Sequence, residues 1–231
     1  MKVRYLIKYT KESEIKFISH LDLMRTIQRV VRRANLPIEY SKGFNPHMTI
    51  SIAQPLSVGV YSCGEYLDAV FKEDVTPDVI LSKLNENTPN GIKFLDVVKV
   101  EDNKAPQAMA AIDGARYIMK FKSKNSEESL KALEKLHELA NWNIVKKTKS
   151  GEKEVDIKPL VKEFKLISNA KTLNFEVLVA CGSRENLSAN LLGDYIKENA
   201  KAIDKEAFVD IERIDMYAYK NNKLVPLNKF F

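Results

Sequence analysis

His20 and His47 are the residues of this chain best suited to acid–base chemistry, and both lie within residues 1–50. His20 follows Ser19, a predicted helix N-cap, and Asp22 stands three residues after that cap, where a capping box places an acid. If the loop that ends at His47 folds back over the helix start, the two imidazoles could serve as base and acid in cleaving an RNA phosphodiester bond. The alternative is that each histidine is a structural residue with its own hydrogen-bond partner.

A second group of residues in the same region suits the binding of a phosphate backbone. Guanidinium donors bind phosphate oxygens in pairs, and aromatic side chains stack on unpaired bases. We therefore predict a nucleic-acid-binding surface made of a basic helix and the loop that follows it: Arg25, Arg29, Arg32, Arg33, Tyr40, Lys42, Gly43, Phe44 and Asn45. The alternative is that the arginines pair with acids of their own domain and that Phe44 packs into the core.

The placement of charge supports an anionic partner. The formal net charge is +6, and residues 1–50 hold ten Lys and Arg against four Asp and Glu, so the remaining residues are balanced. A local excess of this kind favours nucleic acid over a membrane surface or an acidic protein. A chance cluster on a lysine-rich surface is the alternative.

Other kinds of site lack their residues. The eight glycines form neither GxxxxGK[ST] nor GxGxxG, and the two cysteines and three histidines show no metal-ligand spacing, so we predict no metal and no cofactor. No run of 18 apolar residues exists, and the charged N-terminal segment is unlike a signal peptide. Two cysteines are too few for a disulfide framework. We therefore expect no membrane association and a cytoplasmic location.

The elements that would hold these residues follow a βαββαβ order in residues 1–102. An apolar stripe from Leu23 to Ala34 predicts a helix that begins at His20 and carries its arginines off the stripe. A second helix is predicted from Pro77, with Thr76 as its N-cap. Strands are predicted at residues 3–9, 48–52, 65–71 and 92–100. This is the element order of a ferredoxin-like unit.

The same plan with one extra strand, β-α-β-β-β-α-β, is predicted to repeat in residues 115–231, after a linker at 103–114. A helix capped by Ser126 places its leucines in the core, and another apolar stripe begins at Leu187. Strands are predicted at 117–121, between 143 and 179, and at 209–219. We therefore predict an α+β protein of two ferredoxin-like (βαββαβ) units, with antiparallel sheets and helices packed on one face.

Five motifs resemble those of an uncharacterised bacterial family known as radical-SAM-linked proteins, and they cover nearly the whole chain: Phe17–Asp22, Tyr40–His47, Pro55–Gly59, Asp156–Leu160 and Arg213–Tyr217. The resemblance implies a stand-alone partner of a separately encoded radical SAM enzyme. The three-cysteine motif of such enzymes is missing here, so the iron–sulfur cluster would belong to the partner.

The layout of the basic helix and its loop is also similar to that of twin ferredoxin-like RNA-binding and RNA-processing proteins, including the repeat-RNA endoribonucleases of CRISPR systems. Those nucleases carry a glycine-rich loop late in the second unit, whereas residues 180–231 contain only Gly182 and Gly193. We therefore predict an RNA-binding accessory protein that acts on tRNA or rRNA with a separate radical SAM enzyme. The alternatives are a metal-independent endoribonuclease using His20 and His47, and a protein-interaction scaffold without RNA.

Overall fold

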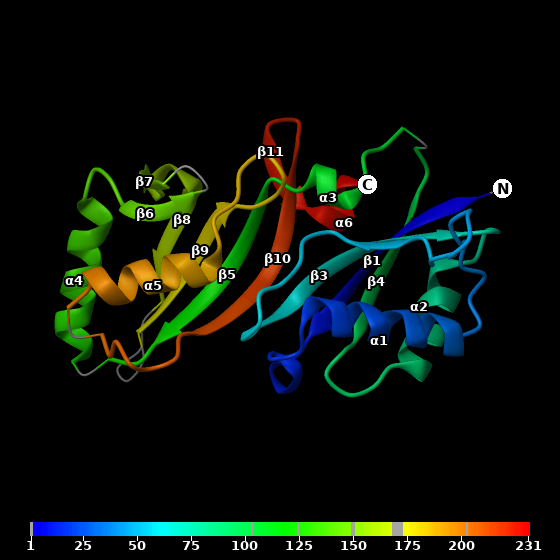
Figure 1. The fold of residues 1–231 in the computed structure, drawn as a ribbon, viewed down its shortest axis with the longest axis horizontal. Helices are drawn as coiled ribbons and strands as arrows, with labels where there is room; N and C mark the ends of the chain where they lie inside the picture. The colour runs from blue at the N-terminus through cyan, green and yellow to red at the C-terminus, as the bar shows by residue number, and fades with distance from the viewer. Residues whose placement is uncertain (1, 103, 124, 149–150, 168–172, 202) are drawn as a thin grey trace. The chain divides into compact units, whose positions relative to one another are not determined.

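The chain forms both strands and helices, and the strands pair antiparallel in most of the sheet, as predicted for the α+β class. The structure is a computed structural model that describes residues 2–102, 104–123, 125–148, 151–167, 173–201 and 203–231. Its contacts divide the chain into two units, one of Met1–Gly114 with Arg213–Phe231 and one of Ala115–Glu212. The chain thus leaves the first unit, builds the second and returns, as the colours of Figure 1 show from blue through green and orange to red.

The first unit has the order β1, α1, β2, β3, α2, β4, which matches the predicted order of elements. In its sheet the strands lie in the order β4-β1-β3-β10, with β2 also on β3 and β11 on β10. The bounds are β1 Val3–Lys11, α1 His20–Arg33, β2 Ile50–Ile52, β3 Val60–Phe71, α2 Pro77–Asn87, β4 Phe94–Val100, α3 Ala108–Ala111, β10 Asp210–Lys220, β11 Lys223–Pro226 and α6 Leu227–Phe230.

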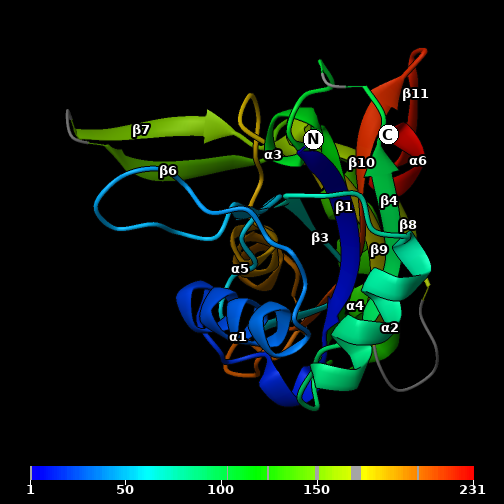
Figure 2. The same cartoon turned by 90° about the vertical axis from the view of Figure 1, so that its right-hand side faces the viewer.

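The core of the first unit lies between its sheet and the two helices α1 and α2, which cover the same face (Figure 2). The apolar stripe of α1 is buried, including Ile27 and Val30, which are inaccessible to water. On the sheet side, the rings of Tyr5 and Phe71 pack with centroids 5.0 Å apart. Because α1 buries this stripe, its arginines must face outward.

In the second unit the strands of the sheet lie in the order β5-β9-β8, and β6 and β7 form a separate hairpin. Trp142 is buried against this unit's helices, since its indole donates to the Leu136 carbonyl (2.8 Å) and its ring lies 5.6 Å from that of Tyr195. The bounds are β5 Gly114–Phe121, α4 Ser126–Glu138, β6 Asn143–Thr148, β7 Gly151–Asp156, β8 Val161–Leu166, β9 Leu173–Ala180 and α5 Ala189–Asn199.

Three details differ from the sequence-based expectation. The segment predicted as a linker contains α3, and the Ala108 N–H donates to the buried carboxylate of Asp68 (2.7 Å), so this segment packs on the first unit. The N-cap of α4 is Asn125 rather than Ser126, because the Asn125 side chain accepts from the Glu128 N–H. Residues 213–231 belong to the first unit, not to a unit of residues 115–231. No helix in the described ranges is long and apolar enough to cross a membrane.

Candidate nucleic-acid interface

The start of α1 is fixed by the predicted N-cap, Ser19, while the Asp22 carboxylate accepts from the Ser19 hydroxyl rather than from its backbone N–H. The Ser19 hydroxyl accepts from the Asp22 N–H (3.2 Å) and donates to the Asp22 carboxylate (2.7 Å). The hydrogen bond from Ser19, and after it the one from Arg25, lowers the pKa of Asp22. This carboxylate is therefore ionised at neutral pH and holds Arg25, whose Nη1 lies 3.1 Å from Oδ1 of Asp22.

The arginine face of α1 consists of Arg25, Arg29, Arg32 and Arg33, and all four side chains are exposed. Arg25 is paired with Asp22, and Arg33 donates to the Asn87 carbonyl (2.7 Å). Neither the Arg29 nor the Arg32 guanidinium has an ion pair or hydrogen bond with any residue that the structure describes. Two guanidinium groups on this face are therefore uncommitted.

The 41–47 loop, Ser41–His47, is closed at its base and exposed at its tip. The Ser41 N–H donates to the His47 carbonyl (2.8 Å), and the His47 N–H donates to the Ser41 hydroxyl (2.9 Å). Gly43 takes the left-handed backbone region with φ of 124°. Lys42 is exposed and Phe44 is fully exposed, so Phe44 does not pack into the core.

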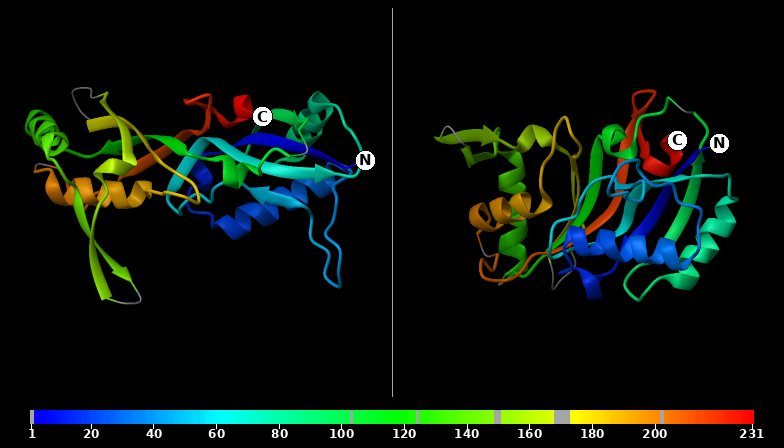
Figure 3. Two further views of the ribbon diagram at one scale, coloured as in Figure 1. Left: turned by 90° about the horizontal axis from the view of Figure 1, so that it is seen from above. Right: turned by 45° about the vertical axis from the view of Figure 1, so that its right-hand side comes forward.

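Figures 2 and 3 show this loop projecting past α1 on the side of the sheet that α1 covers. The segment between α1 and the loop pairs with β3, since Ile38 forms a bridge with Phe71, and Tyr40 forms a bridge with Met48 across the base of the loop. The cations of α1 and the aromatic tip of the loop therefore belong to the same side of the first unit.

Tyr40 has a different environment from Phe44. It is half-buried and packs against the core of the first unit, and the Lys72 ammonium lies 5.9 Å from its ring centroid. Of the two aromatic residues predicted to stack on bases, Phe44 presents its ring to solvent, whereas Tyr40 supports the base of the loop.

The two histidines lie near opposite ends of β3. The Gly59 N–H donates to the Lys16 carbonyl (2.9 Å), so the residues just before α1 lie beside the first residue of β3. The Glu39 N–H donates to the Val70 carbonyl (2.8 Å), so the residues just before the loop lie beside its last residues. β3 has 12 residues, and its ends are roughly 35 Å apart at the rise of an extended strand.

The structure therefore does not bring His20 and His47 together. Nδ1 of His20 is shielded from water and has no hydrogen-bond partner among the described residues. His47 is exposed, and its backbone groups close the 41–47 loop. No acid–base pair of imidazoles follows from this arrangement.

A group of buried charges lies within the first unit and was not foreseen from the sequence. Nε of Arg213 faces Oε1 of Glu65 at 3.1 Å, and both side chains are 1 % exposed. The two groups lack the alignment of a hydrogen bond, so their attraction is chiefly electrostatic. Burial raises the pKa of Glu65, and Arg213 and Lys11 partly offset this rise. No sequence signal marked this pair, because each residue lies in a strand with other charged residues, Asp68 in β3 and Glu212 and Asp215 in β10.

The chain matches a family described as "Uncharacterized protein conserved in bacteria (DUF2344)" over residues 4–189. The chain belongs to this family. The region that matches the DUF2344 family includes α1, the 41–47 loop and β3, whereas Arg213 lies beyond it. No curated protein matches the chain.

Solved structures that resemble the chain do so at low identity. One is a Cbf5-Nop10-Gar1 complex (TM-score 0.48, 9% identity, 92% of this chain and 48% of that chain), and another is an H/ACA RNP bound to a substrate RNA (0.45, 10%, 90% and 46%). A third is an unknown protein from Galdieria sulphuraria (0.28, 11%, 92% and 99%). The DUF2344 chain spans about half the length of the first two chains, and at these TM-scores the likeness carries no functional argument.

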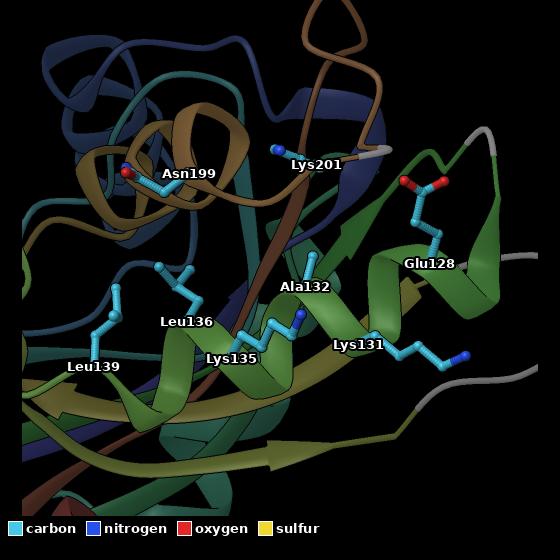
Figure 4. A pocket seen from close by; sticks show the side chains of 8 residues that line it. All are labelled: Glu128, Lys131, Ala132, Lys135, Leu136, Leu139, Asn199 and Lys201. Carbon is cyan, nitrogen blue, oxygen red and sulfur yellow. The ribbon is translucent and has the colours of Figure 1, made fainter.

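A separate cavity lies in the second unit, between α4 and the end of α5 (Figure 4). Its volume is about 420 Å³, and its apolar lining includes Leu136 and Leu139. Leu139, which follows the last residue of α4, is half-exposed, whereas Leu133 and Leu136 within α4 are buried in the core. Within the described ranges, no cluster of three or more His, Cys, Asp or Glu side chains could hold a metal ion.

Proposed function

We propose that this DUF2344 protein binds single-stranded RNA through the arginine face of α1 and the 41–47 loop. The observation that carries this proposal is the combination of uncommitted cations on α1 with an aromatic ring held in solvent on the same side of the unit. Arg29, Arg32 and Lys42 would contact phosphates, because guanidinium and ammonium groups bind phosphate oxygens. Phe44 would stack on an unpaired base.

The number of cations available to contact phosphates sets the salt dependence expected for RNA binding. Arg25 and Arg33 already have partners within the unit, which leaves three cations for phosphates. For a single strand, three phosphate contacts give a slope of about −2 for the logarithm of affinity against the logarithm of salt concentration.

Charge reversal on α1 tests the proposal. Arg29→Glu combined with Arg32→Glu is expected to weaken binding of an oligouridylate at least about tenfold in fluorescence anisotropy, because two charge-assisted contacts become repulsive. Lys131→Glu with Lys135→Glu on α4 is the matched control, since it changes net charge equally on another exposed helix. Binding that is independent of salt, or equal loss in the control, would contradict the proposal.

The accessory role is a further part of this proposal. We infer that the bound RNA is tRNA or rRNA and that a separately encoded radical SAM enzyme acts on it, which rests on the resemblance of the five sequence motifs. A pull-down with sequencing of bound RNA and identification of bound protein tests both parts. Capture of that enzyme from nuclease-treated lysate, with no RNA bound by the purified chain, would support a protein scaffold instead.

We also infer that both units are ferredoxin-like. In the first unit, the order β1-α1-β2-β3-α2-β4 with β2 beside β3 supports this plan. In the second, β5, α4, β8, β9 and α5 follow the first five elements of this order once the hairpin of β6 and β7 is treated as an insertion.

A further inference from the structure

Two of the sequence motifs, Phe17–Asp22 and Pro55–Gly59, meet at the start of α1, where the RNA site proposed above does not use them. Their contact is the hydrogen bond from the Gly59 N–H to the Lys16 carbonyl (2.9 Å). Together they leave three large apolar side chains in solvent, the Phe17 patch: Phe17 (65 % exposed), Leu21 (64 %) and Val58 (54 %).

Buried cations fix the backbone beneath the Phe17 patch. The Lys11 ammonium, in a side chain almost without exposure, donates to the carbonyls of Lys16 (2.9 Å) and Val60 (3.3 Å). The buried Arg213 guanidinium donates to the carbonyls of Gln54 (3.3 Å) and Pro55 (3.4 Å). Both segments that carry the patch are therefore held in place from inside the unit.

A ring and an ammonium group lie side by side in this patch. Nζ of Lys16 is 5.6 Å from the ring centroid of Phe17 and 5.9 Å from that of Tyr61. A nucleotide offers the matching pair of groups, a flat base that stacks on an aromatic face and a phosphate that pairs with an ammonium. Leu21 and Val58 add apolar surface next to the ring.

The Phe17 patch is continuous with the arginine face. Leu21, Arg25 and Arg29 are spaced four residues apart and thus share one side of α1. The helix has 14 residues and spans about 20 Å, with the Phe17 patch at its start and the 41–47 loop after its end. A strand of RNA on the arginine face that continues past the first turn would reach Phe17.

We propose that the Phe17 patch is a second base-stacking site, so that one single strand of RNA lies along α1 between the rings of Phe17 and Phe44. This inference rests on the RNA binding proposed above. The positions of the cations between two exposed rings favour a nucleic acid over a protein as the occupant of the patch.

Oligouridylates of two lengths, about 4 and about 12 nucleotides, test the inference by fluorescence anisotropy. The wild-type affinity is expected to rise with length, and Phe17→Ala is expected to remove about 5- to 100-fold of the affinity for the longer strand, the value of one stacked base. Phe17→Tyr keeps an aromatic face and is expected to bind nearly as the wild type does. Phe208→Ala, at a similarly exposed phenylalanine of the second unit, is the matched control.

The outcomes separate this inference from the proposed function. If Phe17→Ala binds the longer strand as the wild type does while Arg29→Glu with Arg32→Glu weakens both lengths, the second stacking site is wrong and the patch belongs to a protein contact. If none of these variants changes binding of either strand, the RNA site proposed on α1 itself fails. Circular dichroism of each variant shows whether its fold is kept, and Phe17 is exposed enough for Ala to be tolerated.

Discussion

Asp68 places a carboxylate in the interior of the first unit. Its Oδ2 accepts the Ala108 N–H (2.7 Å), and Nε of Arg4 lies 3.8 Å from Oδ1. Burial raises the pKa of Asp68, and the Ala108 hydrogen bond and the Arg4 charge offset part of this rise. The folded state thus holds the Asp68 proton more tightly than the unfolded chain does.

The raised pKa of Asp68 gives its contribution to stability a definite sign. The contribution is fully present below the ordinary Asp pKa of about 3.9 and is lost as the pH rises through the raised value of the folded state. Asp68→Asn can still accept the Ala108 N–H but cannot ionise. We expect the unfolding free energy of this variant, relative to wild type, to increase from pH 4 to pH 8.

Urea unfolding at several pH values measures this difference. Asp194→Asn is the control, because Asp194 is exposed on α5. A difference between Asp68→Asn and wild type that stays constant with pH would show that burial does not disfavour the Asp68 carboxylate.

At the scale of elements, the pair of Glu65 and Arg213 ties β3 to β10. Removing one partner leaves an uncompensated buried charge, so Arg213→Ala is expected to lower the unfolding free energy by about 3–5 kcal/mol. Replacing both residues by leucine is expected to cost less than the sum of the two single changes, because no lone charge then remains.

A double-mutant cycle by urea unfolding tests this coupling. Arg32→Ala serves as the matched control, since the exposed arginine is expected to change stability by no more than about 0.5 kcal/mol. Strict additivity of Glu65→Leu and Arg213→Leu would mean that the two side chains do not stabilise one another.

The elements near the candidate site differ in how far the sequence could predict them. The start of α1 was predicted because the Ser19 N-cap is a local signal. The pairing of Glu65 with Arg213 joins residues far apart in the sequence, and no local pattern contains it. The exposure of Phe44 and the half-burial of Tyr40 likewise depend on how the loop meets the sheet, which spacing alone does not specify.

At the scale of the whole molecule, the first unit is made from two separated parts of the chain. Residues from Arg213 onward supply most of β10, and the Asp215 carboxylate there accepts from Lys8 and from the Tyr66 hydroxyl, both at 2.7 Å. α6 also contacts β1 and β4. The first unit therefore depends on residues that follow the second unit in sequence.

Removing residues 213–231 is expected to destabilise the first unit, whereas the second unit is expected to keep its fold. Hydrogen exchange should show loss of protection in β1 and β3 and retained protection in β9 and α5. Removing only residues 221–231 keeps Arg213 and Asp215, so β1 and β3 are expected to lose less of their hydrogen-exchange protection than after removal of residues 213–231. Equal protection of β3 in the full and the shorter chain would contradict this dependence.

The interrupted first unit also sets an order of events on the ribosome. Ala115–Glu212 can fold as soon as they emerge, whereas the first unit must wait for Arg213 and the strand that follows. At the usual speed of translation this delay is roughly 5–20 s, during which the edge of β3 has no partner from β10. A nascent chain of this protein would thus present an open strand edge, a row of unpaired backbone groups on which a strand of a neighbouring chain can pair.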